Sequence, residues 1–333
     1  MTLGLYFRSC RVTVDAGGAL LDKLKRDFSW FTTQRVPTAR QFGVTALLAA
    51  PDWNGIRGPY FFSHFNGRVY GWGDRRWVRY SDSLVTYDAV ARQGRVESLD
   101  EERLHHYTYY LIIAVVGQEL DELGFHRLHA LGVVVEGRAA LFSMPVTGGK
   151  TTLGLALMQD PAIGLYSEDT PLIDHRGCVH SFAVRLSLRE GYSAAIPERF
   201  LRLKNDPVAG RKILVDLEYH GLDRVPTTPG CNALVFWSVR SGCPRPSVEL
   251  LTYWRSLTLL LYHIVVGKGC PQRAEVILRL SPGGIRMLAT LLVRRALAAW
   301  AISRRSRSYR FHMSPDVAAN ADFITHFIRT YSA

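Results

Sequence analysis

Alternating apolar and polar positions dominate the first hundred residues. The alternation over residues 3–15 predicts a half-buried strand, because successive side chains of a strand point to opposite faces. Between residues 43 and 88, short aromatic and β-branched runs are separated by turn-forming pieces, of which Asn66-Gly67 is typical of a two-residue hairpin turn. We therefore expect a small antiparallel β region at the start of the chain.

From Ser98 onward the spacing of apolar residues is first typical of a helix and then of strands and helices in turn. Apolar residues recur at three- and four-residue spacing from Ser98 to Leu123, and Gly124 is placed to end that helix. A strand-like run follows, with a hairpin turn expected at Glu136-Gly137-Arg138. Residues 210–255 mix strands and turns, and long helical patterns prevail from Pro246 onward.

The length and this order of elements predict an α/β protein of more than one part. A chain of 333 residues is near the size at which one hydrophobic core gives way to two. We expect a β-rich module with one helix over residues 1–120, an α/β core over 121–255 and a helical region over 256–333.

The cysteines, the apolar runs and the net charge indicate in which compartment the protein works and what kind of partner it binds. The five cysteines show no Cys-x-x-Cys pair and no zinc-ligand spacing, which argues against a disulfide framework or a structural metal. We see no leader peptide, and no apolar run reaches the ~20 residues of a membrane span, so a cytoplasmic location is expected. The 41 basic against 29 acidic residues give a net charge of +12. Arginines concentrate toward the end of the chain, which indicates a solvated face, an acidic partner or nucleic acid; no helix-turn-helix, zinc-finger or RNP pattern supports nucleic acid.

A glycine-rich segment carries the clearest chemical signal. It follows an apolar strand and opens a helix, which is the setting in which backbone N–H groups bind phosphate. Lys150 would reach the β and γ phosphates, and the Thr151 hydroxyl would bind Mg²⁺. The full phosphate-loop pattern requires a glycine at position 144, where this chain has Met144. The predicted nucleotide-binding residues are Thr147, Gly148, Gly149, Lys150, Thr151 and Thr152.

An acidic pair begins 17 residues after Thr151. Glu168 and Asp169 end the apolar run that begins at Ile163, at the carboxyl end of a predicted strand. One carboxylate could hold Mg²⁺ while the other accepts a proton from an attacking hydroxyl, although a simple turn cap is the alternative.

The stretch from LHALGVVVEGRAALFSMPVTGGKTTLGLALMQ to LYSEDTPLIDHRGCVHSF resembles the catalytic domain of the HPr kinase/phosphorylase family and its HPr-kinase-related members. The resemblance covers roughly residues 120–225. It implies the phosphate-loop kinase fold shared with phosphoenolpyruvate carboxykinases, the cofactors ATP (or GTP) and Mg²⁺, and site roles for His129 and for the acidic pair. Met144, and Glu168 in place of the family's first aspartate, depart from the family's pattern. The family's second, phosphorylase-linked signature is not recognisable.

Basic residues further along are weaker candidates. Arg211 and Lys212 follow Gly210 before an apolar run, and related kinases place a cation on such a loop to meet the transferring phosphoryl group; a surface role is the alternative. Arg185 and Arg189, in the run that follows the acidic turn, are candidates of the same rank.

The resemblance implies a kinase that transfers the γ-phosphoryl group to a hydroxyl, with a serine of a peptide or small protein as the expected acceptor. A catalytically inactive nucleotide-binding scaffold and a small-molecule kinase of the same fold are the alternatives. We leave open the oligomeric state and which of Glu168 and Asp169 is the base.

Overall fold

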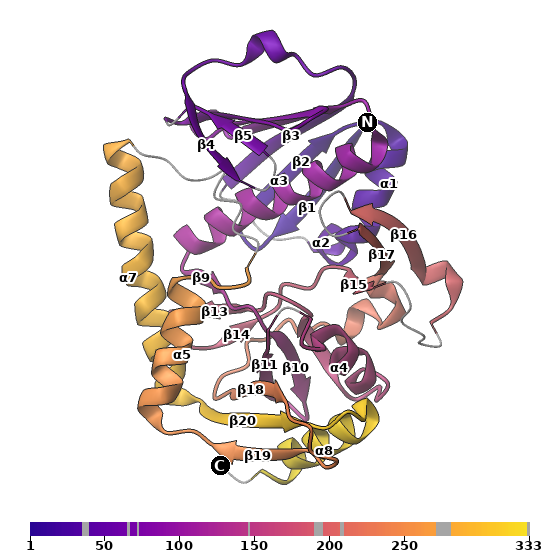
Figure 1. The fold of residues 1–333 in the computed structure, drawn as a ribbon, viewed down its shortest axis with the longest axis vertical. Coiled ribbons are helices and arrows are strands. Elements are labelled where there is room, and N and C mark those ends of the chain that lie inside the picture. The colour runs from indigo at the N-terminus through magenta and orange to yellow at the C-terminus, as the bar shows by residue number, and fades with distance from the viewer. Residues whose placement is uncertain are drawn as a thin grey trace. The chain divides into compact units, whose positions relative to one another are not determined.

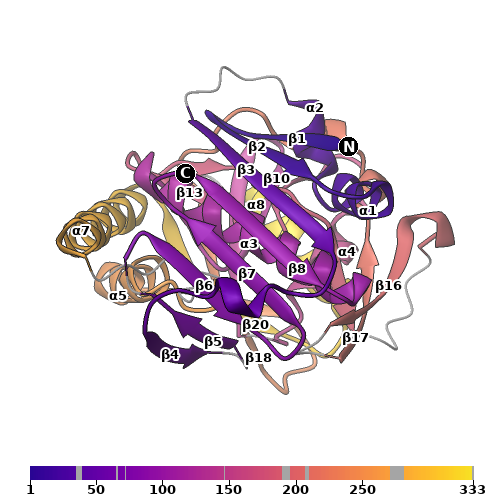
Figure 2. The same cartoon turned by 90° about the horizontal axis from the view of Figure 1, so that it is seen from above.

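Two compact units make up the computed structural model of the chain (Figures 1 and 2), and each is assembled from separate stretches. Unit 1 comprises the described residues of Met1–Glu119, Ser187–Tyr219 and Pro271–Thr290, and unit 2 those of Leu120–Leu186, His220–Cys270 and Leu291–Ala333. The structure describes residues 1–34, 40–64, 67–71, 73–145, 147–189, 196–206, 210–270 and 281–331.

Unit 1 contains a mixed eight-stranded sheet. Its strand order is β1-β2-β3-β8-β7-β6-β5-β4, with parallel pairing of β3 to both β2 and β8 and antiparallel pairing elsewhere. The antiparallel part, β4 to β7, falls within the predicted antiparallel region of residues 43–88. The prediction is wrong for β3, at the start of that region, because β3 pairs parallel with both of its neighbours. The strands are β1 (Thr2–Phe7), β2 (Cys10–Asp15), β3 (Arg40–Leu48), β4 (Tyr60–His64), β5 (Gly67–Tyr70), β6 (Arg75–Arg79), β7 (Ser83–Asp88) and β8 (Gln93–Ser98).

The segment 3–15 was predicted as one strand, and that prediction is wrong. It forms the antiparallel hairpin β1–β2, whose turn places Arg8 at a φ of 53°. Both arms keep the alternation, because a hairpin does not change the side-chain period of its strands. Asn66, the predicted hairpin-turn residue, lies outside the described residues, while β4 and β5 pair antiparallel on either side of it.

The remaining elements of unit 1 are a long helix on the sheet, two short helices and a small sheet. The long helix α3 crosses the sheet (Figure 2) and packs on β8, where a side chain at Gly94 would lie 2.7 Å from Leu111. These elements are α1 (Gly18–Asp27), α2 (Ser29–Thr33), α3 (Glu101–Glu122, its last residues in unit 2), β15 (Leu186–Arg189), β16 (Leu201–Asp206), β17 (Gly210–Val215) and the 3-10 turns Trp53–Gly55, Glu198–Phe200 and Leu217–Tyr219.

Unit 2 is built on a six-stranded sheet of order β12-β10-β11-β18-β20-β19. β18 runs parallel to both β11 and β20, and β10 is antiparallel to both β11 and β12. The carboxyl ends of β11, β12, β18 and β20 therefore meet at one edge of the sheet. The strands are β10 (Leu131–Val135), β11 (Arg138–Ser143), β12 (Gly164–Ser167), β18 (Leu234–Arg240), β19 (Ser247–Leu250) and β20 (Arg307–Met313).

Helices cover both faces of this sheet. Val235 and Trp237 join the core beneath α5 and α7, whereas the alternate Phe236 stacks on Phe142 and contacts Phe327 of α8. This alternation buries both faces, which explains the continuous apolar run of β18. The other elements of unit 2 are α4 (Lys150–Leu157), α5 (Tyr253–Val265), α7 (Pro282–Arg305, from Leu291 onward in this unit), α8 (Val317–Thr330), the turn Leu222–Arg224, and a sheet of β9 (Phe125–Arg127), β13 (Leu172–Asp174) and β14 (Val179–His180).

The C-terminal region was predicted as helical, and the structure corrects that in part. Two strands, β19 and β20, lie within it, and β20 sits between β18 and β19 in the sheet. Its residues Arg307–Met313 alternate between the faces, as a strand requires, and end the helical pattern of α7. The apolar segment 274–280, also predicted as helical, lies outside the described residues.

One disulfide joins Cys178 to Cys231, although the cysteine spacing argued against a disulfide framework. Val179 and Gly230 exchange two backbone hydrogen bonds, which set the neighbouring cysteines opposite each other. A contact between residues so far apart in sequence leaves no spacing signal. Among the described residues, no helix combines the length and apolar character needed to cross a bilayer.

Candidate functional site

A tight loop joins β11 to α4 at the carboxyl edge of the unit 2 sheet. Gly149 is the residue before the first turn of α4 and has a φ of 102°, and its carbonyl accepts the hydrogen bond of Leu153 N at 2.8 Å. Thr147 also has a positive φ, 68°. Such a conformation turns successive backbone N–H groups toward one side, which makes a helix start an anion site. The predicted loop therefore has the expected strand and helix on its two sides; Val146 lies outside the described residues.

Both loop glycines are needed for this path. A Cβ on Gly148 would lie 2.8 Å from the carbonyl oxygen of Pro145, which is backbone and cannot move aside easily. Gly149 has room for a Cβ, but its positive φ disfavours any L side chain. The two glycines are thus required for different reasons.

Lys150, the first residue of α4, is held by two side chains. Its Nζ donates to Oδ1 of Asp169 at 2.6 Å and contacts Nε2 of His129. Nε2 of His129 is itself 3.2 Å from the same Asp169 oxygen. Lys150 is 8 % exposed and the Asp169 side chain 35 % exposed, so the carboxylate faces outward from a buried cation.

His129 reaches this cluster from the linker between β9 and β10, although its apolar neighbours in the sequence are typical of a strand. Hydrogen bonds of 3.0 Å run from Leu128 N to the Pro171 carbonyl and from Ala130 N to the Asp169 carbonyl, and they hold the linker between β9 and β10 against the acidic turn. Gly269 packs on the ring, since a Cβ there would lie 2.2 Å from Nδ1 of His129. Backbone pairing thus fixes the histidine beside Asp169.

The second carboxylate pairs with the other polar residue of the helix start. Thr151 donates its hydroxyl hydrogen bond to Oε1 of Glu168. Burial and the neighbouring charge of Asp169 raise the pKa of Glu168 to about 7, against the opposing effects of Lys150 and of the Thr151 hydrogen bond. Glu168 therefore changes charge in the neutral range.

The pKa of Asp169 is shifted in the opposite direction. Burial acts to raise its pKa, but the hydrogen bond of His129 and the charge of Lys150 outweigh burial and hold the pKa well below its usual range. Adjacent carboxylates with separated pKa values are typical of sites in which one group binds a cation while the other handles a proton.

Arg240 is a candidate that the sequence prediction missed. It ends β18, the parallel neighbour of β11, and its guanidinium lies 3.5 Å from the position of a Cβ on Gly149. Its side chain forms no ion pair with the residues that the structure describes. Parallel strands end at a common edge of the sheet. A basic residue directly after the apolar run 234–239 was therefore the one sequence signal that could have placed Arg240 near the loop.

Met144, the departure at the first loop position, is a core residue. Its side chain is 3 % exposed and lies beneath the loop, 3.1 Å from where a Cβ on Gly148 would be. The methionine therefore supports the loop from below and does not occupy its outward face.

The remaining predicted residues divide between the two units. Arg185 belongs to unit 2, is buried, and lies near enough to Glu168 to lower the pKa of that carboxyl. Arg211 and Lys212 lie on β17 in unit 1, where Lys212 pairs with Asp206 at 3.2 Å. Thr152 lies in the first turn of α4, half-buried.

The donor set fits Mg²⁺ held jointly with a phosphate ligand. A threonine hydroxyl and a carboxylate are oxygen donors, and Mg²⁺ usually takes one or two protein oxygens together with water and phosphate. Within the described ranges there is no cluster of three or more His, Cys, Asp or Glu that would form an all-protein metal cage. Thr151 and Glu168 are the residues that would hold the ion.

Comparison of the sequence with models of known protein families and with curated proteins finds no match.

Proposed function

We propose that this chain is a kinase of the HPr-kinase-like type, which transfers the γ-phosphoryl group of ATP or GTP to a hydroxyl group. The observation that carries the proposal is the pairing of two elements: a glycine loop before a helix, and an acidic doublet whose members contact Lys150 and Thr151 of that helix. Contacts of this kind bring a phosphate-binding cation, a metal-binding hydroxyl and two carboxylates within reach of one substrate.

The residues divide the work as follows. The loop N–H groups and Lys150 bind the phosphates, and the incoming phosphate displaces Asp169 from the lysine. Thr151 and Glu168 would hold Mg²⁺, which would neutralise charge on the phosphate oxygens. Arg240, above Gly149, stabilises the charge that spreads over the transferring group.

The charge and the hydrogen bond of Lys150 are two of the causes that lower the pKa of Asp169, and both are lost when phosphate takes the lysine. Asp169 then accepts the proton of the acceptor hydroxyl, and His129 orients it. A bond forms between the acceptor oxygen and the γ-phosphorus while the bond from that phosphorus to the bridging oxygen breaks. The products are a phosphate ester and the nucleoside diphosphate. Positioning and charge supply most of the acceleration, because the transition state is loose.

We infer a serine in a peptide or small protein as the acceptor, on the resemblance to HPr-kinase-related proteins and on the net charge of +12, which favours acidic partners. A small-molecule acceptor is the variant of this proposal. A cytoplasmic location fits it, since the nucleoside triphosphate is available there.

The test is transfer of label from γ-³²P-ATP, with Mg²⁺, to a degenerate serine-peptide library, comparing wild type with D169N and E168Q. Label on peptide that D169N abolishes, while nucleotide binding persists, supports the kinase. The opposing candidate is a catalytically inactive nucleotide-binding scaffold. It is favoured by Met144 and Glu168, the two positions at which the chain departs from the family's pattern. It predicts nucleotide binding with no transfer to any acceptor, small molecules included.

A further inference from the structure

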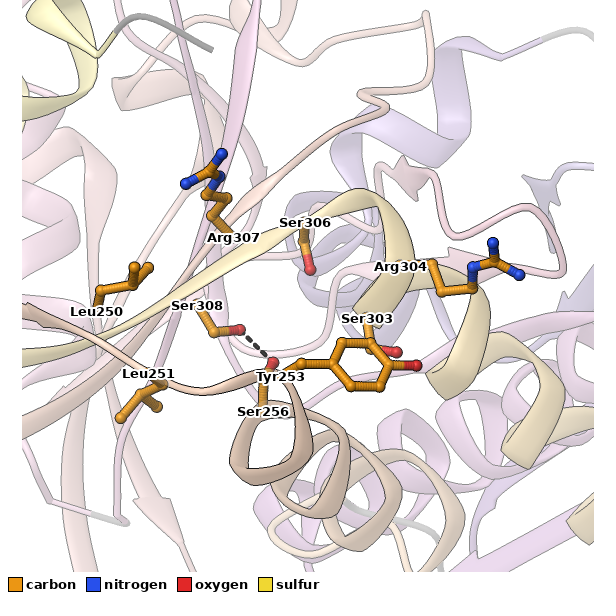
Figure 3. A pocket seen from close by; sticks show the side chains of 9 residues that line it. All are labelled: Leu250, Leu251, Tyr253, Ser256, Ser303, Arg304, Ser306, Arg307 and Ser308. Carbon is orange, nitrogen blue, oxygen red and sulfur yellow. Dashed lines mark hydrogen bonds between the residues drawn. The ribbon is translucent and has the colours of Figure 1, made fainter.

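A hydroxyl-lined cavity of about 460 Å³ lies in unit 2 between the start of α5, the end of α7 and the start of β20 (Figure 3). Ser256 and Ser308 hydrogen-bond to each other on its floor. Arg304 and Arg307 are at its rim, exposed, and neither forms an ion pair with any residue in the described part of the chain. The cavity therefore offers positive charge without an internal counter-ion.

Exposed apolar side chains continue from this cavity along both helices. Two lie on α5, eight residues apart, and a third lies four residues further on, just after the end of the helix. On α7 they recur at spacings of four and three, so each set lies along one side of its helix. The two helices lie side by side, joined by a hydrogen bond from Arg295 to the Val265 carbonyl. We call this set the α5/α7 surface: Trp254 (74 % exposed), Tyr262 (45 %), Val266 (61 %), Val293 (60 %), Leu297 (54 %) and Trp300 (46 %).

The charge on these helices has one sign. Neither α5 nor residues 291–305 of α7 contain an aspartate or glutamate, while Arg255, Arg294 and Arg304 are exposed on them. Arg304 also stacks over the Trp300 ring at 4.9 Å, which joins the cavity rim to the apolar stripe. Exposed apolar side chains on adjacent helices, together with charges of one sign, are typical of a docking site for a partner of opposite charge.

We propose that an acidic peptide segment of a partner protein docks on the α5/α7 surface. Its apolar side chains pack on Trp254 and Trp300, and its carboxylates meet Arg304 and Arg307. This interaction is independent of the proposed kinase activity.

The side-chain directions favour an extended acidic segment over a single anion. In Figure 3, Arg307 extends away from the serine hydroxyls on one side of the cavity, and Arg304 extends beyond the Tyr253 ring on the other. Guanidinium groups that diverge in this way suit two carboxylates spaced along a chain. A second copy of this chain would oppose arginine to arginine, and a flat membrane surface would not enter the cavity.

The test is selection of a random 12-residue peptide display library on the purified full chain, followed by fluorescence polarisation with the enriched peptides. We expect peptides rich in Asp and Glu with interspersed aromatic or aliphatic residues. Their affinity should fall at least about 30-fold in the double variant R304E/R307E and about 10-fold in W300A. R245E reverses one arginine charge on an exposed loop outside the cavity, which is half of the charge change of the double variant, and should bind like wild type. Thermal melts of each variant check the fold.

K150M separates this proposal from the catalytic one, because it should bind the same peptides as wild type. Three results would overturn the proposal: enrichment of peptides that bind R304E/R307E equally well, binding instead to phosphatidylserine vesicles that the double variant loses, or a concentration-dependent dimer in sedimentation that W300A abolishes. Equal binding to the double variant would show that the arginines are not part of a peptide site. Vesicle binding would assign the α5/α7 surface to a membrane, and the dimer would assign it to self-association.

Discussion

Nζ of Lys150 lies 2.6 Å from Oδ1 of Asp169, so the residue expected to bind phosphate and a residue expected to handle the proton are partners before any substrate arrives. Phosphate must compete with Asp169 for the lysine. The pair compensates the charge of a buried cation, while the carboxylate side remains partly open to solvent.

Replacing Lys150 with methionine should weaken nucleoside triphosphate affinity at least about 100-fold, because a charge-assisted contact to phosphate disappears while the apolar stem is kept. Titration with a fluorescent ATP analogue measures this. K25M, on the exposed side of α1, removes the same charge away from the loop and should bind like wild type. Equal affinity of K150M and K25M would contradict the role of the loop.

Replacing Glu168 with glutamine should make the protein more stable at pH 8.5 than the wild type, and not at pH 4.5. The raised pKa of Glu168, about 7 against 4.5 in the reference state, means that the folded state holds its proton more tightly. The contribution to stability is fully present below pH 4.5 and is lost as the pH rises through about 7. The full shift would correspond to at most about 3 kcal/mol.

Denaturant unfolding at both pH values measures this difference for wild type, E168Q and the exposed control E198Q. A stability gain of E168Q that does not change with pH would show that the carboxyl group is not the titrating species.

Replacing Gly149 with alanine should cost about 1–2 kcal/mol of unfolding free energy, because its φ of 102° is left-handed. Gly17 provides a matched control, since it also precedes a helix but has a φ of −64° and open space around it. G17A should change stability by no more than about 0.5 kcal/mol. Chemical denaturation of the two variants compares them, and equal costs would argue against the loop conformation.

Replacing Met144 with alanine should destabilise the protein by about 2–4 kcal/mol, because the side chain is buried beneath the loop and its removal leaves a cavity. Urea unfolding measures the loss. M144L, which nearly conserves volume, should cost less than about 1.5 kcal/mol. A neutral M144A would mean that the loop does not rest on this side chain.

Local signals in the sequence were sufficient for much of unit 2. The hairpin turn at Glu136 and Gly137 has the positive φ values of 49° and 78° that such a turn requires, and α3 ends before Gly124 as predicted. The strand, loop and helix around Lys150 also follow from local pattern and turn chemistry.

Features that depend on contacts between distant segments were not predictable. Arg240 comes beside Gly149 only because β18 pairs with β11, and Cys178 meets Cys231 through the bridge of Val179 to Gly230. The strand β20 was missed because it directly follows the long helical pattern of α7, and the boundary between two adjacent elements is the least predictable part of a sequence.

The position of β20 has a consequence for biosynthesis. This strand, near the end of the chain, is inserted between β18 and β19, so the sheet that carries the Lys150 loop lacks an interior member until residue 313 has left the ribosome. Until then β18 has an unpaired edge of apolar residues, which is the kind of surface that chaperones protect and that aggregates when translation stalls. Truncations that remove the last strand should therefore yield insoluble protein even though every residue of the glycine loop is retained.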